Sequence, residues 1–233
     1  MNALVITGAT SGIGRAIATR FLVDGWGVVN LSRRPSPDPG VESLLCDLSE
    51  PGAVESLRDD LLGRIAGVGR LCVVHNASAM RSDRIDALPS EALRSVLELN
   101  IVGANALNQI LLPEMPPGSS LIYIGSTLAE KAVPGVASYV IAKHALVGMM
   151  RATCQDLAGR GLHTCMICPG FTDTEQLRGL IGDNPETLAG IESMSAFGRL
   201  IEPEEIAETV AFAAQAPVLN GAVIHANLGQ RER

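Results

Sequence analysis

Aromatic and basic side chains are both scarce in this sequence. Phe, Trp and Tyr make up 3% of its 233 residues, and 25 Asp and Glu outnumber 18 Lys and Arg, for a net charge of -7. Proteins that bind nucleic acids stack bases on aromatic rings and place clustered basic side chains on the phosphates. The composition therefore argues against DNA or RNA as a partner.

A leader pattern and long apolar runs are absent as well. The opening segment, Met1 to Gly8, has no basic stretch and too few apolar residues for a signal peptide. No run reaches the ~18 apolar residues of a membrane span. The five cysteines, an odd number, lie mostly in apolar segments, at positions 46, 72, 154, 165 and 168. These features predict a cytoplasmic protein with reduced thiols and no membrane association.

Cys165 and Cys168 form a Cys-x-x-Cys pair that is suggestive of redox or metal chemistry. The pair lies in His163-Thr-Cys-Met-Ile-Cys, which is typical of a strand, so residues three apart point to opposite faces. No second cysteine pair completes a zinc site, and the four histidines are scattered. We therefore expect structural cysteines and no metal site.

What the sequence does contain is an alternation of strand and helix patterns from end to end. Apolar runs typical of strands buried on both faces occur at 4–6, 27–31, 71–74, 121–124 and 164–167, with weaker ones at 41–46 and 222–226. Helical patterns occur at 13–24, 51–65, 90–112, 138–159 and 203–215. The alternation predicts a single α/β domain, a Rossmann-type doubly wound parallel sheet with helices on both faces.

Two segments interrupt the alternation. The Pro-rich stretch 35–40 predicts a turn after the second strand. The stretch 171–203 carries no strand pattern and leaves the carboxyl end of a strand, where ligands bind in such sheets. We interpret it as a substrate lid. Its side chains Leu177, Leu180, Ile181, Met194 and Phe197 fit either a pocket wall or ordinary helix core, and Arg178 and Arg199 fit either an anion site or salt bridges.

A glycine-rich turn follows the first strand and opens the first helix. Its residues are Thr7-Gly8-Ala-Thr10-Ser11-Gly12-Ile13-Gly14. Backbone amides at a helix start bind phosphate groups, and glycines let a pyrophosphate approach. Any tight turn between a strand and a helix also favours glycine, so spacing alone leaves both interpretations open.

The spacing Thr-Gly-x-x-x-Gly-x-Gly resembles that of the short-chain dehydrogenase/reductase family, classical type. The likeness spans nearly the whole chain. Further matching segments are His75-Asn76-Ala77-Ser78, Asn100 in Leu97-Glu-Leu-Asn-Ile, Ser126, Tyr139 with Lys143, Pro169-Gly170, Gly198-Arg199 and Pro203-Glu-Glu-Ile-Ala. Two departures stand out: His75 and Ser78 replace the first Asn and the Gly of the family's Asn-Asn-Ala-Gly. The usual Asp-Gly-Gly after the last strand is also missing.

The resemblance implies a catalytic set of Asn100, Ser126, Tyr139 and Lys143. In the family, the serine holds the substrate oxygen, the tyrosine exchanges a proton, the lysine holds the nicotinamide ribose, and the asparagine supports a water chain to the lysine. Residues four apart share a helix face, so Lys143 is predicted to stabilise the Tyr139 phenolate and lower its pKa from about 10. The structural alternative is a surface tyrosine stacked on a lysine stem.

The resemblance also implies a nicotinamide dinucleotide site. Ser32 takes the position of the NAD-selecting Asp, and Arg33 that of an Arg that prefers a 2'-phosphate, which predicts NADP(H) with NAD(H) still possible; a solvated basic pair is the alternative. Asp47 resembles an adenine contact or a helix start, and Thr172 a nicotinamide contact. The full predicted set is Gly8, Thr10, Ser11, Gly12, Ile13, Gly14, Ser32, Arg33, Arg34, Asp47, Leu48, Asn76, Ala77, Tyr139, Lys143, Pro169, Gly170 and Thr172.

Together these features predict an NADP-dependent oxidoreductase that reduces a ketone or oxidises the secondary alcohol. A non-catalytic NADP(H)-binding protein of the same fold is the alternative. The Tyr-x-x-x-Lys spacing and the length disfavour the family's enoyl reductase and epimerase branches, and a 3-oxoacyl group, a small ketone and a secondary-metabolite intermediate all stay open as substrates. The largely apolar helices at 100–112 and 138–158 predict a homodimer or homotetramer, with burial inside the monomer as the alternative.

Overall fold

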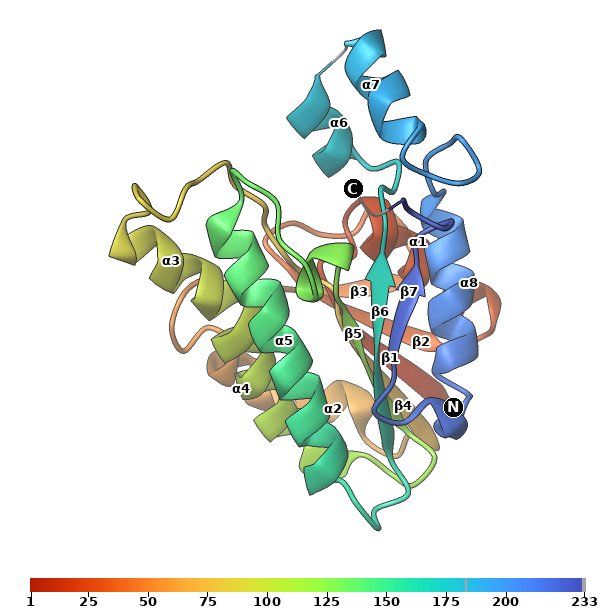
Figure 1. Cartoon of the computed structure of the whole chain (residues 1–233). Coiled ribbons are helices and arrows are strands. Elements are labelled where there is room, and N and C mark those ends of the chain that lie inside the picture. The colour runs from red at the N-terminus through yellow and green to blue at the C-terminus, as the bar shows by residue number, and fades with distance from the viewer. Residues whose placement is uncertain (183, 232–233) are drawn as a thin grey trace.

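One parallel sheet organises the chain in the computed structural model, which describes residues 1–182 and 184–231 (Figure 1). In that part of the chain the sheet has seven strands in the order β3-β2-β1-β4-β5-β6-β7. The strands are β1 Asn2–Thr7, β2 Gly27–Ser32, β3 Val41–Leu45, β4 Arg70–His75, β5 Ser120–Ile124, β6 His163–Pro169 and β7 Val223–Ala226. The strand order reverses direction between β1 and β4, which creates a crevice at their carboxyl ends.

Helices cover both faces of the sheet, as the alternation of patterns predicted. They are α1 Gly12–Val23, α2 Arg58–Ile65, α3 Ser90–Leu97, α4 Gly103–Leu111, α5 Ala137–Asp156, α6 Glu175–Ile181, α7 Pro185–Glu192 and α8 Pro203–Ala213. The predicted doubly wound α/β fold is confirmed.

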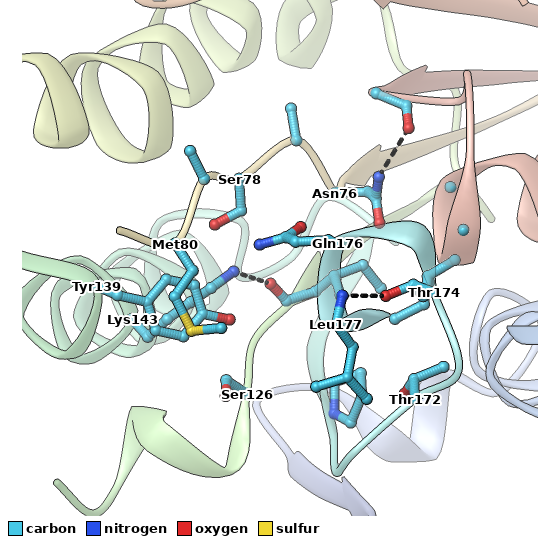
Figure 2. Close-up of a pocket in the computed structure, with 18 of the residues that line it drawn as sticks. Asn76, Ser78, Met80, Ser126, Tyr139, Lys143, Thr172, Thr174, Gln176 and Leu177 are labelled. Carbon is cyan, nitrogen blue, oxygen red and sulfur yellow. Dashed lines mark hydrogen bonds between the residues drawn. The ribbon is translucent and has the colours of Figure 1, made fainter. Parts of the chain in front are cut away.

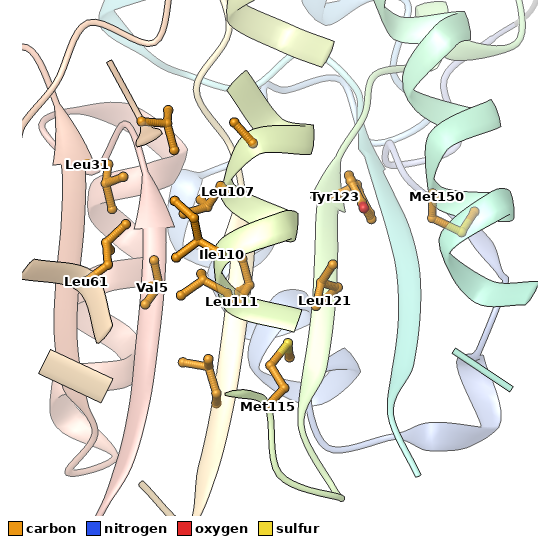
Figure 3. Packing of buried hydrophobic residues seen from close by; sticks show 14 of the residues in the cluster. Val5, Leu31, Leu61, Leu107, Ile110, Leu111, Met115, Leu121, Tyr123 and Met150 are labelled. Carbon is orange, nitrogen blue, oxygen red and sulfur yellow. The ribbon is translucent and has the colours of Figure 1, made fainter. Parts of the chain in front are cut away.

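Two apolar clusters, one on each face, hold the sheet between the helices. On one face α1 and α8 pack against each other and cover side chains such as Leu4 and Ile6. On the other, α2, α4 and α5 cover a cluster that includes Val5, Leu107 and Met150 (Figure 3). Neighbouring strand residues alternate between the two clusters because successive side chains of a strand point to opposite faces.

The cysteines of the Cys-x-x-Cys pair follow the same alternation. Cys165 belongs to the cluster beneath α1 and α8, and Cys168 to the opposite cluster. Both are buried, and burial raises the pKa of the Cys165 thiol to about 12. The two thiols face different sides of the sheet, which confirms the structural interpretation. Among the described residues, no helix is long and apolar enough to cross a membrane.

The structure corrects two predicted helix boundaries. The helix expected over 90–112 is interrupted by a π-helical turn, η2 (Glu98–Val102), where the Asn100 side chain donates to the Val96 carbonyl at 2.9 Å. Such wide turns inside a helix are frequently found at functional sites. The helix expected over 51–65 begins only at Arg58, after a 3₁₀ turn, η1 (Glu55–Leu57).

The segment 171–203 forms a small helical layer at the carboxyl end of the sheet. It contains α6 and α7, which stand apart from the main body in Figure 1. An isolated bridge between Thr172 and Ile201 brings its two ends together. The chain's last described residues hold it in place: Ala196 N–H donates to the Leu228 carbonyl, and Arg231 N–H to that of Met194.

Candidate active site

A cavity of about 730 Å³ lies at the carboxyl ends of the strands, beneath the segment 171–203. Its walls come from the glycine-rich turn, from the ends of β2, β4, β5 and β6, from α5 and from the chain's last described residues. This size is within the range of small-molecule and cofactor sites. The position is the one expected for ligands at the reversal of strand order.

The cavity brings together nearly all of the predicted site residues. The predicted residues in its lining are Gly8, Thr10, Ser11, Gly12, Ile13, Gly14, Ser32, Arg33, Arg34, Asp47, Leu48, Asn76, Ala77, Ser126, Tyr139, Lys143, Pro169, Gly170 and Thr172. Asn100 is the exception: it is 4% exposed and lies behind the wall.

The glycine-rich turn is shaped to receive an anion. Gly8 has a φ of 76°, and a Cβ on Gly14 would lie 2.2 Å from the Gly8 carbonyl oxygen, so no other residue fits there without movement of the turn. Helix α1 begins at Gly12 without a side-chain cap and without an acidic residue in its first turn. Its first amides and positive dipole end are therefore available to a phosphate group. The residues present thus fit a dinucleotide.

Asn76 fixes this turn to the neighbouring strand. Its side-chain amide donates to the carbonyls of Thr7 and Gly8 at 3.0 and 3.1 Å, and the Thr7 hydroxyl accepts from the backbone of Asn76 and Ala77. Because these bonds cross the gap between β1 and β4, they hold the glycine turn beside the strand-end residues.

Two exposed arginines stand at the end of β2. The side chain of Ser32 is occupied: it accepts from Asn30 at 2.7 Å and donates to the Arg34 carbonyl at 2.5 Å. Arg33 and Arg34 are exposed, and among the described residues neither forms a salt bridge. An unpaired guanidinium at a pocket wall is suited to a phosphate.

Asp47 lies opposite these arginines and shapes the loop after β3. Its carboxylate accepts from the backbone and hydroxyl of Ser49 at 3.0 and 2.7 Å, and these bonds, more than the charge of Arg33, lower its pKa. The alternative prediction, that Asp47 starts a helix, is wrong, because the chain continues in turns as far as η1. The acid instead orders a loop that faces the cavity.

Ser126 and Tyr139 meet across the floor of the cavity. Ser126 follows β5, and its hydroxyl accepts from Leu128 N–H at the start of the short helix η4 (Thr127–Ala129). A hydrogen bond with Ser126 lowers the pKa of Tyr139, but burial, the larger effect, raises it. In Figure 2 Tyr139 and Lys143 lie together on one side of the cavity and Asn76 on the other, with Gln176 between them.

Lys143 is a buried ammonium one helical turn after Tyr139. It is 2% exposed, and its Nζ donates to the Ile124 carbonyl at 2.8 Å and lies 5.4 Å from the centre of the Tyr139 ring. Burial lowers the pKa of Lys143 to about 8. The prediction that Lys143 lowers the pKa of Tyr139 is not met in this structure, since burial decides the direction for the tyrosine. The surface-stacking alternative fails as well, because the lysine is buried.

Comparisons with known proteins identify the family of the chain. Residues 8–231 match the family described as Enoyl-(Acyl carrier protein) reductase. A short-chain dehydrogenase/reductase from Serratia marcescens is 27% identical, with a TM-score of 0.85 over 98% of this chain and 97% of that one. The chain belongs to the short-chain dehydrogenase/reductase family.

Two other family members resemble it over most of their length. The 3-oxoacyl-[acyl-carrier-protein] reductase FabG of Salmonella typhimurium is 27% identical, over 97% of this chain and 95% of that protein. The ligand-free aldohexose dehydrogenase of Thermoplasma acidophilum has a TM-score of 0.90 and 26% identity, over 98% and 93% of the two chains. The predicted family membership is confirmed.

The two departures from the family pattern have different surroundings. His75 faces the core: its ring stacks on Tyr123 with centroids 4.8 Å apart, Nε2 bonds Asn108 at 2.7 Å, and burial lowers its pKa to about 4. It is therefore a neutral structural residue. Ser78 lines the cavity and donates to Asn100 Oδ1 at 2.9 Å, which links Asn100 in η2 to the site through one side chain.

The segment 171–203 contributes one wall of the cavity. Of its five apolar residues named from the sequence, Leu177, Leu180, Ile181 and Met194 line the cavity, whereas Phe197 does not and is 70% exposed. Arg178 pairs with Asp173 at 2.7 Å and Arg199 with Glu205 at 2.7 Å, so both arginines form salt bridges.

Several lining residues were not predicted. They include Met80, Arg81, Lys131, Val133, Val136, Gln176, Gln230 and Arg231. Most lie on loops next to predicted residues. Those on the loops after β4 and β5 could have been predicted, because the carboxyl ends of parallel strands gather at the edge of the sheet where ligands bind. No sequence signal pointed to Gln230 and Arg231, because their place depends on the bonds between the end of the chain and the segment 171–203.

Proposed function

We propose that this protein is an NADP(H)-dependent oxidoreductase that reduces a ketone or oxidises the corresponding secondary alcohol. The observation that carries the proposal is the convergence of Ser126, Tyr139 and the buried Lys143 in the cavity that contains the glycine-rich turn. A hydroxyl that binds oxygen, a phenol that exchanges a proton and an adjacent ammonium are what carbonyl reduction requires besides a hydride.

In the proposed mechanism the nicotinamide cofactor, when bound, supplies or accepts the hydride. Ser126 donates a hydrogen bond to the substrate oxygen and orients it towards Tyr139. The Tyr139 hydroxyl gives its proton to that oxygen in reduction and takes it back in oxidation. Lys143 would hold the ribose of the bound cofactor, next to the Tyr139 ring. Ser78 and Asn100 are hydrogen-bonded to each other beside this group. In the family, the asparagine supports the water chain through which the proton is replaced.

The coenzyme preference is proposed from the end of β2. Ser32 offers no carboxylate to a ribose 2'-hydroxyl, and Arg33 and Arg34 have no ion-pair partner among the described residues. A 2'-phosphate gains charge-assisted hydrogen bonds from such groups. NADP(H) is therefore the proposed cofactor, with NAD(H) as a weaker one.

The substrate is proposed to be a small molecule with an apolar body around its carbonyl. The apolar side chains Leu177, Leu180, Ile181 and Met194 of the proposed lid line the same cavity as the loop residue Met80 and the segment before α5. FabG of Salmonella typhimurium is a 3-oxoacyl reductase and the Thermoplasma protein is an aldohexose dehydrogenase, so both relatives named above interconvert a carbonyl and an alcohol. A 3-oxoacyl thioester is therefore the first substrate to test.

A homodimer or homotetramer is proposed from the outer surfaces of α4 and α5. Val102, next to α4, is 46% exposed, and Ala145 and Gly148 form an exposed strip of small residues on α5. Apolar and small side chains left uncovered on neighbouring helices suit helix packing between subunits. Sedimentation at several concentrations measures the oligomeric state.

Tyr139→Phe, measured with a panel of ketones and NADPH, tests the proposed function. The change keeps the ring but removes the hydroxyl, so NADPH binding should persist while kcat falls by ~10²- to 10⁴-fold. Absorbance of the reduced nicotinamide reports turnover, and titration of protein fluorescence reports binding. Near wild-type turnover by Tyr139→Phe would overturn the catalytic role. NADPH binding with no turnover of any ketone, enoyl thioester or alcohol would favour the non-catalytic alternative.

A further inference from the structure

The first turn of α5 is capped from a distant loop. Helix α5 has no side-chain cap of its own at Val136 and no acidic residue in its first turn. Its first free N–H groups, on Ala137, Ser138 and Tyr139, therefore need partners from elsewhere. Asp83, in the loop 76–89 between β4 and α3, supplies two of them.

Four hydrogen bonds join Asp83 to this helix start. The Asp83 carboxylate accepts from Ser138 N–H at 2.9 Å and from the Ser138 hydroxyl. The Asp83 carbonyl accepts from Ala137 N–H at 3.3 Å, and Asp83 N–H donates to the Gly135 carbonyl at 2.9 Å. The backbone bonds form an isolated parallel bridge between Asp83 and Val136. Ser138 is buried, so water does not replace these bonds.

The bonds of Asp83 join two walls of the cavity and include Ser138, the residue before Tyr139. The loop that contains Asp83 also contributes Ser78, Met80 and Arg81 to the lining, and the segment before α5 contributes Val133 and Val136. A shift of the first turn of α5 would therefore move the Tyr139 hydroxyl relative to Ser126, which is held separately at the end of β5. Misplacement of a reacting group by about 1 Å can cost ~100-fold in rate.

We infer that Asp83 is a positioning residue, which caps α5 from outside and thereby fixes the place of Tyr139. It does not touch the reacting atoms. The inference rests on the proton-transfer role proposed for Tyr139. It concerns geometry rather than charge, because what the donors of Ser138 and Ala137 need is acceptor oxygens in the right place: two on the Asp83 carboxylate for Ser138 and the Asp83 carbonyl for Ala137.

Three variants separate this role from a general loss of stability. Asp83→Ala removes both carboxylate contacts, and Asp83→Asn keeps one acceptor oxygen and the side-chain shape. Asp86→Ala is the matched control, because its carboxylate lies in the same loop but pairs only with exposed Arg84 at 3.0 Å. For each variant, kcat, KM and the NADPH Kd are measured together with hydrogen exchange of the amides of residues 137–139.

We expect Asp83→Ala to lower kcat by ~10- to 100-fold, with the NADPH Kd unchanged and faster exchange at 137–139. Asp83→Asn should restore kcat to within about threefold of the wild type, and Asp86→Ala should match the wild type. Unchanged exchange in Asp83→Ala, an unchanged kcat, or an Asn variant as impaired as the Ala variant would each overturn the inference.

Failure of the proposed function gives a different result. In that case the wild type itself would turn over no carbonyl substrate, and the Asp83 variants could show no change in kcat. The exchange of the three amides reports on the cap directly, whether or not the protein turns over a ketone.

Discussion

Replacing the buried Lys143 by Met should stabilise the ligand-free protein while abolishing its activity. Lys143 is 2% exposed, and among the described residues no carboxylate pairs with it; its Nζ donates to the Ile124 carbonyl. Burial disfavours the charged form, which is why the pKa falls from 10.5 to about 8. At pH 7 the folded protein therefore holds an ammonium in an environment that disfavours it.

The size of the effect follows from the shift in pKa. Each unit corresponds to about 1.4 kcal/mol, so the fall from 10.5 to about 8 amounts to about 3 kcal/mol against the folded state at pH 7. The lost hydrogen bond to Ile124 offsets about 1 kcal/mol of the gain. The free energy of unfolding of Lys143→Met should therefore exceed that of the wild type by about 2 kcal/mol at pH 7.

The stability difference between the wild type and Lys143→Met should also depend on pH, because it arises from the same pKa shift. Between pH 8 and 10.5 the unfolded lysine keeps its proton while the folded one has lost it, so wild-type stability rises with pH relative to Lys143→Met. Urea unfolding of both proteins from pH 7 to 10 measures the difference, which should shrink as pH rises. Lys131→Met, at the chain's other lysine, is the control and should not stabilise the protein at pH 7. A Lys143→Met protein less stable than the wild type at pH 7, or a difference constant with pH, would refute the reasoning.

Three further predictions concern the cofactor and the lid segment. Arg33→Asp should move the NADPH/NADH ratio of kcat/KM towards NADH by at least ~10-fold; an unchanged ratio, also in the variant with Arg34 replaced, would contradict the phosphate site. Gly14→Ala places a Cβ 2.2 Å from the Gly8 carbonyl oxygen, so both Tm and NADPH affinity should fall, with a loss of ~1–3 kcal/mol in stability; differential scanning fluorimetry with and without NADPH measures both. Amides of residues 171–196 should become more protected from hydrogen exchange when cofactor and substrate bind, and protection already complete without ligands would exclude a gating lid.

The strands and the helices on each face were predictable because their patterns are local. Strands such as β5 and β6 are buried on both faces and therefore appear as continuous apolar runs. The interruption at η2 was not predictable, since 97–102 keeps a helical pattern in sequence. It depends on the bonds of Asn100 to Val96 and Ser78, and Ser78 comes from another part of the chain.

The site was predictable where strand ends and the family resemblance apply, and less so elsewhere. Tyr139 and Lys143 share a helix face by spacing alone, but the burial that sets their pKa values depends on the elements packed around α5. Gln230 reaches the cavity because the end of the chain bonds to the segment 171–203. Tertiary contacts of this kind have no local pattern.

In the part of the chain that the structure describes, several polar groups at the carboxyl ends of the strands lack the partners that usually stabilise such groups in a folded protein. Helix α1 has an uncapped first turn there, Lys143 is buried without a counter-ion, and Arg33 has no carboxylate partner among the described residues. Two arginines that do not line the cavity differ from Arg33: Arg178 and Arg199 are both paired with acids. The buried Lys143 ammonium costs stability in the ligand-free protein, and each of the three groups is one that a phosphate or a ribose would satisfy.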